Sequence, residues 1–333
     1  MTAVVEERDR SLLTRVQHLL HSQATIGPAV VLLVSVVVFA LLSERFLTPG
    51  NISLILQQVA VVGTLAVGQT VVILTAGIDL SCGAIMVLTS IVMAKVASET
   101  GLPGLPALLL GFLVGTVCGL LNGLLVTRLK LPPFIVTLGT LNVFFALNLW
   151  YSGSATIRGT DMPSLLLWTG QTFTVGGTRI TYGSIMLVLL VALMAFVLKN
   201  TAWGRHVYST GDDLEASRLS GIRTARVLLS VYATAGLIYA VAAWTLIGRI
   251  ASASPQAGQT DNLDSITAVV IGGTSLFGGR GAVVGSLIGA LIVGVFRNGL
   301  ALAGVDVLWQ TMAVGVLIIV AVSLDQWIRK VKA

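Results

Sequence analysis

The chain has 333 residues, of which 55% are hydrophobic and only 10% are charged, against roughly 25% charged residues in an ordinary soluble domain. This composition excludes a soluble domain and predicts an all-α, polytopic membrane protein. The net charge of +6 does not require a nucleic-acid partner, because basic residues on cytoplasmic loops account for it.

Residues 1–25 form a polar N-terminal segment. They lack the apolar core and small-residue cleavage site of a signal peptide. The stretch "RSLLTRVQHLL" places its leucines and Val16 on one helical face, which predicts a short amphipathic helix on the cytoplasmic membrane surface. A frayed tail is the alternative. Residues 26–333 are then a single transmembrane domain.

Apolar runs that approach the roughly 20 residues needed to cross a bilayer recur along the rest of the chain. Lys and Arg cluster at the N-terminus, at 127–130, at 199–226 and at 329–332, so all four regions are expected on the cytoplasmic side. Both termini are then inside, which requires an even number of crossings. Eight crossings are an alternative, but ten satisfy every cluster, and the eighth of them is short. The predicted crossings are 26–43, 52–76, 83–98, 104–127, 134–151, 182–199, 226–250, 265–277, 281–300 and 306–326.

Glycines recur every four residues in the fourth and ninth predicted crossings. On a helix such a stripe lets a neighbouring backbone approach closely, so helix packing is the predicted role. Because the two crossings are five apart and run in opposite directions, the stripes suggest an inverted repeat of five plus five helices. The glycines concerned are Gly111, Gly115, Gly119 and Gly123, and Gly281, Gly285 and Gly289.

The cytoplasmic loop at 199–226 carries the stretch "STGDDLEASRLSGIRTAR", with three acids and three arginines in eighteen residues. Asp212 is a good helix N-cap, Glu215 can complete a capping box, and Gly221 suits a left-handed C-cap. The pattern predicts a helix of about two turns, too short to be stable without docking against something. A loop that is charged only because it is solvated is the alternative.

The residues "GDDLEASRLSGI" resemble the coupling loop of permease subunits in ATP-driven importers, whose pattern is Glu-Ala-Ala, three residues, then Gly. Ser217 stands in place of the second alanine, and the Ile-x-Leu-Pro tail of the maltose-type branch is missing. The resemblance implies that this loop forms a coupling helix seated on an ATPase subunit. The implied contact residues are Asp212, Glu215, Ala216, Ser217, Arg218 and Gly221.

Further stretches resemble the ribose-type monosaccharide permeases of bacterial inner membranes: "TAGIDLSCGAIMVL" (75–88), "FIVTLGTLN" (134–142), "RLSGI" (218–222) and "AVVIGGTSLFGGRGAVVGSLIGALIVG" (268–294). The resemblance extends over about residues 45–325. It implies an importer in which a separate ATPase holds ATP and Mg, an external binding protein delivers the sugar, and two permease chains pair, as a homodimer or a heterodimer. Ribose, fructose, xylose and galactose all remain open.

No enzymatic role is predicted for this chain. It has no GxxxxGK[ST] phosphate loop, no H-E-x-x-H and no G-x-S-x-G. Cys82 and Cys118 lack metal-ligand spacing and are interpreted as small membrane-core residues. No catalytic residue, metal site or cofactor is therefore expected.

Polar side chains inside the predicted crossings are expected to face other helices or a wet pathway. Asp79 and Ser81 are interpreted first as caps of a helix start or as gate elements, and Arg280 as a candidate ion partner of Asp79. The remaining pathway candidates are Gln57, Gln69, Asn122 and Asn142, for which bonding between helices is the alternative.

Two external segments are 152–181, which is long enough to have structure of its own, and 251–264, which carries Asp261 and Asp264. The resemblance implies that they are candidates for docking the binding protein. An ion-coupled secondary carrier or a channel is the competing function. Ion coupling usually needs several acids or histidines inside the membrane, and Asp79 is the only acid well inside the predicted crossings. A carrier would also leave the charged stretch 209–226 unexplained.

Overall fold

The computed structural model describes residues 26–330, so the predicted N-terminal amphipathic helix (residues 1–25) lies outside the described residues. Each of the predicted crossings coincides with a helix. Within the described part, 7 helices are long and apolar enough to cross a membrane, and α12, with 11 residues, is as short as the eighth crossing was expected to be. The helices at the predicted crossings are α2 (Ile26–Leu42), α3 (Pro49–Ile73), α4 (Cys82–Thr100), α5 (Gly104–Arg128), α6 (Pro133–Ser152), α8 (Tyr182–Asn200), α11 (Thr224–Ile250), α12 (Asp261–Ile271), α13 (Val283–Leu302) and α14 (Val307–Lys330).

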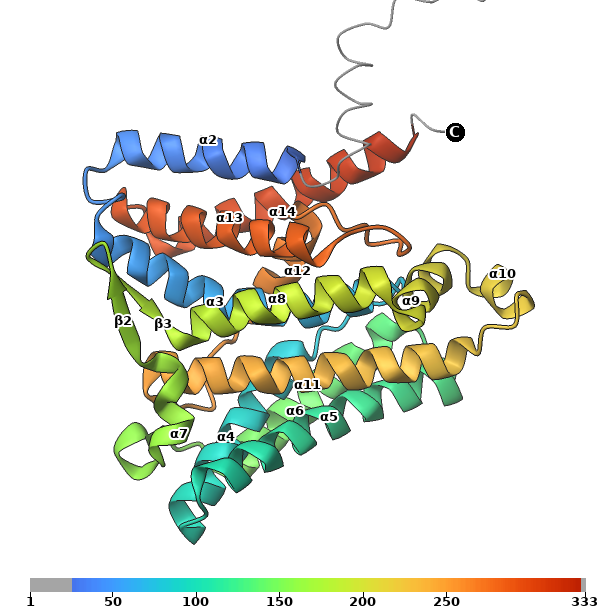
Figure 1. The fold of residues 1–333 in the computed structure, drawn as a ribbon, viewed down its shortest axis with the longest axis horizontal. Helices are drawn as coiled ribbons and strands as arrows, with labels where there is room; N and C mark the ends of the chain where they lie inside the picture. Colours follow the sequence, from blue (N-terminus) through green and yellow to red (C-terminus); the bar gives the residue numbers. More distant parts are fainter. Residues whose placement is uncertain (1–25, 331–333) are drawn as a thin grey trace, which may run out of the picture.

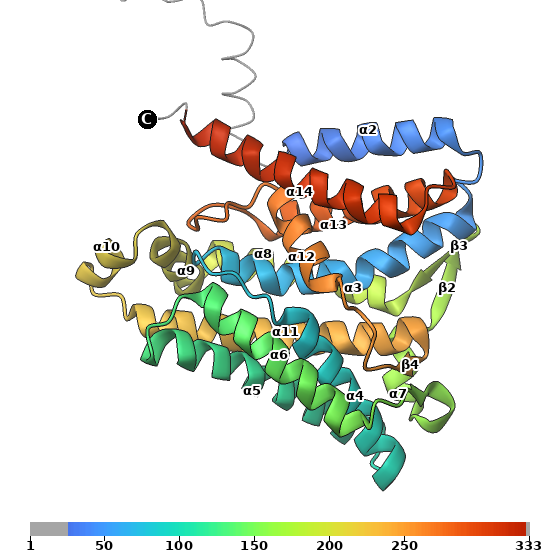
Figure 2. The same cartoon turned by 180° about the vertical axis from the view of Figure 1, so that it is seen from behind.

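The helices form a layered bundle with roughly aligned axes (Figure 1). Helices α2, α13 and α14 lie along one side, α4, α5 and α6 along the other, and α3 and α11 run between them, as the view from behind also shows (Figure 2). Helix α3 is apolar around most of its circumference and buries nearly all of its second half, from Val59 to Ile73. A helix that is apolar on all faces belongs in the interior, so α3 is the centre of the core.

Two breaks in the helices follow from local backbone chemistry. Helix α3 stops at Ile73, and the turn that follows places Ala76 in the left-handed region, at φ 60°. Helix α12 stops at Ile271 because Gly272 and the left-handed Gly273 (φ 85°) follow it. The predicted crossing at 265–277 therefore lies a few residues too late, since its last residues form the glycine-rich loop before α13.

The packing pairs have the pattern that the predicted inverted repeat requires. Helix α5 packs on α11, and its counterpart α13 packs on α3. Helix α4 contacts α5, α6 and α11, whereas its counterpart α12 contacts α13, α14 and α3. Helices α3 and α11 contact each other at the centre. Because the paired helices are five crossings apart, each runs opposite to its counterpart.

The first glycine stripe packs as predicted. A Cβ on Gly115, Gly119 or Gly123 would meet residues of α11, and one on Gly111 would meet Met93 of α4. These contacts confirm the close-packing role of the stripe.

The prediction for the second glycine stripe (Gly281, Gly285 and Gly289) is partly wrong. Gly281 lies before α13 in a loop, at φ 142°, so it is not a helical residue. Gly285 and Gly289 are on α13 and pack against Gly272 and Ala268 at the end of α12. The left-handed conformations of Gly278, Gly279 and Gly281 prevent the helix from starting earlier.

The two ends of the bundle carry different structures. At one end, here called the hairpin end, strands β2 (Thr172–Val175) and β3 (Thr178–Thr181) pair antiparallel, with Thr172 opposite Thr181 and a turn at the left-handed Gly176 and Gly177. Strand β1 (Ile157–Arg158) pairs with β4 (Ser252–Ala253), next to the short α7 (Ser164–Leu167). The segment 152–181 thus has structure of its own. At the other end, the α10 end, α9 (Ala202–Asp212) and α10 (Leu214–Leu219) project beyond α8 and α11 (Figure 1).

Candidate functional site

The α10 helix is defined by capping at both of its ends. The carboxylate of Asp213 accepts a hydrogen bond from the Ala216 amide at 2.9 Å, so Asp213 is the N-cap and the prediction of Asp212 is wrong by one residue. Asp212 instead ends α9. At the C-terminus, Gly221 is left-handed at φ 85°, and Ile222 N donates to the carbonyl of Ser217 at 3.1 Å. This is a Schellman ending, with Gly221 in the predicted C-cap role.

The other predicted coupling residues divide by exposure. Glu215 does not complete a capping box, because the backbone amide of the N-cap residue Asp213 donates to Ser209 O instead. The Glu215 carboxylate Oε1 lies 3.9 Å from Arg218 Nη1 in an exposed ion pair. Ser217 is buried, with its hydroxyl 2.7 Å from that of Ser209 on α9. Ser217, which stands where the importer pattern has its second alanine, thus links α10 to α9 through its hydroxyl. Glu215, Ala216 and Arg218 are exposed.

Two leucines of α10 are exposed. Leu214 is 46% exposed and Leu219 is 87% exposed, although the helix has only 6 residues. A leucine so exposed in a short polar helix has no partner within the described chain, and exposed apolar patches mark interaction surfaces.

Helix α9 connects α10 to the two broken regions of the bundle. The Tyr208 hydroxyl donates to Gly281 O at 2.8 Å, and burial raises the pKa of Tyr208, which keeps it protonated as a donor. Gly279 N donates to Leu74 O at 3.0 Å. Gly211 of α9 packs against both of these residues so closely that a side chain would collide with them. The end of α9, the loop after α3 and the loop before α13 therefore meet at one junction.

A buried polar network surrounds Asp79 in the break before α4. Asp79 accepts from the amide of Ser81 at 2.8 Å and from its hydroxyl at 2.6 Å, and Asn122 donates to the Ser81 hydroxyl at 2.8 Å. Tyr239 donates to Gln69 at 3.1 Å next to this group. Asp79 thus holds the turn before α4 through Ser81, which is the N-cap residue and makes no side-chain capping bond, and the candidates Ser81, Asn122 and Gln69 lie together.

Three other pathway candidates do not join that network. Asn142 is exposed on α6 and donates to Leu138 O, so it lies apart from the network, and its pathway role stays a prediction. Arg280 is exposed at the α10 end and makes no ion pair with the fully buried Asp79, so that pairing is wrong. Gln57 is half-buried and donates to Ser53. The sequence could not reveal these orientations, because they depend on which face of each helix is covered.

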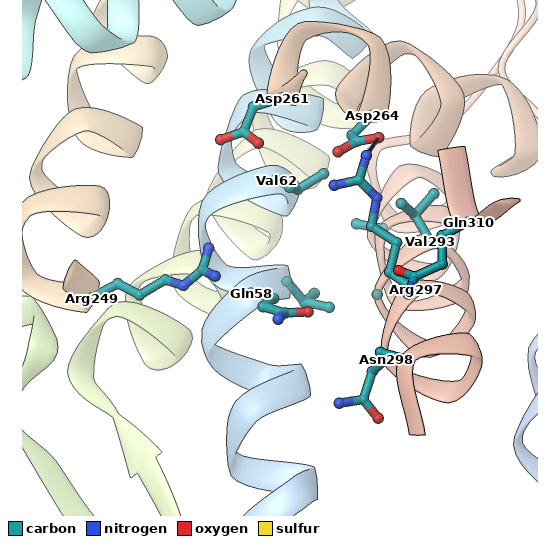
Figure 3. A pocket seen from close by; sticks show the side chains of 13 residues that line it. Gln58, Val62, Arg249, Asp261, Asp264, Val293, Arg297, Asn298 and Gln310 are labelled. Carbon is teal, nitrogen blue, oxygen red and sulfur yellow. Dashed lines mark hydrogen bonds and ion pairs between the residues drawn. The ribbon is translucent and has the colours of Figure 1, made fainter. Parts of the chain in front are cut away.

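A polar cavity lies in the hairpin half of the bundle. It has a volume of about 300 Å³ and is bounded by α3, α11, α12, α13 and α14 (Figure 3). Arg297 donates to the buried Asp264 at 2.7 Å, and Arg249 extends from α11 towards Gln58 on α3. The polar lining residues are Gln58, Arg249, Asp261, Asp264, Arg297, Asn298 and Gln310.

The cavity corrects two expectations. Asp261 and Asp264 do not belong to an external loop; they lie in the first turn of α12, and Asp264 is only 1% exposed. Asp79 is therefore not the only acid inside the bundle. The signal in the sequence was the spacing of Asp261 and Asp264 at the start of a short apolar segment, since acids three apart share a helical face. Arg249 and Arg297 gave no comparable signal.

Comparisons with known proteins agree with this architecture. The family model described as the permease component of a branched-chain amino acid transport system matches residues 51–322. The fructose import permease protein FrcC of Rhizobium meliloti is 52% identical, over 99% of this chain and 93% of the relative. The ribose import permease protein RbsC of Bacillus subtilis (strain 168) is 42% identical, over 90% of this chain and 92% of the relative.

The galactose/methyl galactoside import permease protein MglC of Escherichia coli (strain K12) is 34% identical, over 90% of this chain and 93% of the relative. These matches extend over nearly the whole length of the proteins compared. The chain therefore belongs to this family of permease components, in its group of monosaccharide import permeases, and is a transport subunit that crosses the inner membrane several times.

Proposed function

We propose that this chain is the membrane-spanning subunit of an ATP-driven importer, in which a separate ATPase binds ATP and Mg and seats α10 in a groove on its surface. The observation that carries the proposal is the exposed apolar pair on α10. Leu214 and Leu219 are exposed on a helix of 6 residues that projects beyond the bundle. Ser217 and Ser209 hold one side, and the ATPase covers the other.

The junction behind α10 supports a mechanism for transmitting force. When the ATPase pair closes on ATP, α10 and α9 move together. The move reaches the break after α3 through Leu74 and the loop before α13 through Tyr208 and Gly281. The break after α3 lies next to the Asp79 network, and the loop before α13 leads into the helix that lines the cavity in the hairpin half, so a shift at both alternates access to the two sides. Hydrolysis then resets the starting state.

The substrate we propose is a monosaccharide. The relatives named above are import permeases for fructose, ribose and galactose or methyl galactoside, and the fructose permease is 52% identical to this chain over the 335 aligned residues. Fructose is therefore the first sugar to test. An external sugar-binding protein delivers it at the hairpin end, and two copies of this chain pair to match the two ATPase subunits. The α10 end, which carries Arg218, Arg223 and Arg226, faces the cytoplasm.

The competing ion-coupled carrier gains nothing from the second buried acid. Asp264 is paired with Arg297 at 2.7 Å, so it is not an isolated proton or sodium site. A carrier also needs no apolar surface on α10.

The test replaces Leu219 with glutamate in the intact importer. Leu219→Glu places a charge in the apolar contact, so the ATPase should no longer co-purify and ATP-driven uptake of D-fructose should be lost. Val175→Glu is the control for ATPase co-purification, because Val175 is similarly apolar and 55% exposed but lies in the hairpin at the opposite end, so the ATPase should still co-purify. If Leu219→Glu retains the ATPase and transports at the normal rate, the coupling proposal is wrong.

A further inference from the structure

The cavity in the hairpin half holds polar groups that nothing in the described chain satisfies. Asp264 Oδ2 is buried and accepts no hydrogen bond there, although Oδ1 is bound by Arg297. Among the described residues, Asp261 and Arg249 make no side-chain hydrogen bond or ion pair, yet both line the cavity. Buried polar groups without partners are costly, so a ligand with several hydroxyl groups would be stabilised here.

The charges of the cavity balance. Two carboxylates, Asp261 and Asp264, face two guanidinium groups, Arg249 and Arg297. A ligand with a net charge would leave one of these groups uncompensated in a partly buried site, which is unfavourable. An uncharged ligand keeps the balance, and each charged group can make a strong hydrogen bond to a hydroxyl.

The shape of the lining matches a sugar as well. One wall is apolar and comes from α3 and α13, through Val59, Val62, Ala290 and Val293. The charged groups come from α11 through Arg249 and from α12 through Asp261 and Asp264, and α13 adds Arg297 (Figure 3). A monosaccharide presents C–H groups on its faces and hydroxyls at its edges, and a volume of about 300 Å³ holds one such molecule.

We propose that this cavity is a binding site for one monosaccharide within a single permease chain. The sugar binds there during transport, after it leaves the external binding protein and before it is released on the inner side. Sugar hydroxyls donate to Asp261 and to Asp264 Oδ2, and Arg249 and Gln58 donate to sugar oxygens. The site rests on the proposed sugar import, and it adds the residues that hold the sugar. Its lining comes from α3 in the first half of the repeat and from α11–α14 in the second, so a relative shift of the halves opens it.

The first experiment measures protection of a cysteine in the cavity wall. Val62→Cys lines the cavity, whereas Val61→Cys is 0% exposed in the core of the same helix and is the matched control. The native Cys82 and Cys118 are buried, so the unmodified chain gives the background level of maleimide labelling. The permease–ATPase complex, in nanodiscs and without the external binding protein, is labelled with a water-soluble maleimide.

Val62→Cys should react and Val61→Cys should not. D-fructose or D-ribose at ten times its dissociation constant should slow labelling of Val62→Cys about tenfold, because occupancy divides the free fraction by one plus that ratio. Failure of Val62→Cys to react, or equal rates with and without either sugar, would overturn the site. Protection by L-leucine alone would also overturn it, because a zwitterion would then be the ligand.

The second experiment assigns the polar wall. Asp261→Asn, in the Val62→Cys background, keeps the side-chain volume but removes a charged acceptor. About tenfold more sugar should be needed for the same protection, as expected for the loss of one hydrogen bond to a charged group. Glu99→Gln, an exposed acid near the hairpin end of α4, should change nothing. Unchanged protection in Asp261→Asn would contradict the assignment.

The outcome separates the two proposals. If sugar protects Val62→Cys while uptake proves independent of the ATPase, the cavity stands and the importer mechanism fails. If uptake needs the ATPase but no sugar protects, only the cavity proposal fails.

Discussion

At Gly119 the backbone of α5 lies directly against the backbone of α11. A Cβ built there would collide with the carbonyl oxygen of Tyr232 and come within 3.0 Å of Gly236 Cα. The sequence marked this residue correctly, because three GxxxG units in a row predict close helix packing whatever the partner is. It could not name the partner, which is a property of the assembled bundle.

Gly119→Ala should therefore destabilise the permease by about 1–3 kcal/mol, the usual cost of overpacking a close contact. Gly139→Ala is the matched control, since it changes the same residue type in α6 with nothing within 4 Å of the new Cβ. Thermal unfolding of the detergent-solubilised protein measures both. Equal melting temperatures for the two variants would contradict the packing role of Gly119.

At the scale of elements, the short helix α10 depends on its caps. It has 6 residues, so its hydrogen bonds alone cannot offset the entropy of ordering it. Asp213, the Schellman ending at Gly221 and the bond between Ser217 and Ser209 supply the difference. The residues before and after each helix determined its exact ends, as at Pro49 and at Gly272.

Replacing the N-cap should loosen this element selectively. Asp213→Ala removes the acceptor for the Ala216 amide and should cost about 1 kcal/mol of local stability. Hydrogen exchange of the amides of residues 216–222 should speed up about fivefold, the factor that corresponds to about 1 kcal/mol. Asp212→Ala, one residue earlier and without a capping bond, should leave exchange unchanged. Faster exchange in Asp212→Ala alone would restore the N-cap predicted from the sequence.

At the scale of the whole molecule, the arrangement has two unlike ends and two related halves. The hairpin, β1 and β4 lie at one end and α9 and α10 at the other (Figures 1 and 2). The pairing of α5 with α11 and of α13 with α3 relates the halves. The orientation that we propose has the α10 end in the cytoplasm, as the basic residues of the loop at 199–226 predict.

This orientation predicts opposite labelling of the two ends in intact cells. Val175→Cys, on the hairpin, should react with a membrane-impermeant maleimide from outside. Leu219→Cys, on α10 and 87% exposed, should react only after the cells are permeabilised. Labelling of Leu219→Cys in sealed cells would reverse the proposed topology and remove α10 from any ATPase.

The sequence alone predicted the class of the molecule, the positions of its helices, the close-packing stripe of α5 and the existence of α10. All of these depend on local chemistry: apolar length, glycine spacing, caps and stops. A predicted relation between residues distant in the chain failed, namely Arg280 as an ion partner of Asp79.

Only the tertiary structure decided which polar side chains share a space. Arg249, Asp264 and Arg297 come from three different helices, and their meeting depends on how α11, α12 and α13 are rotated about their axes. That rotation is set by the packing of all the apolar faces at once, as is the junction between α9, Leu74 and Gly279. Hydropathy and spacing along one helix cannot encode it, because they describe each helix before its neighbours are in place.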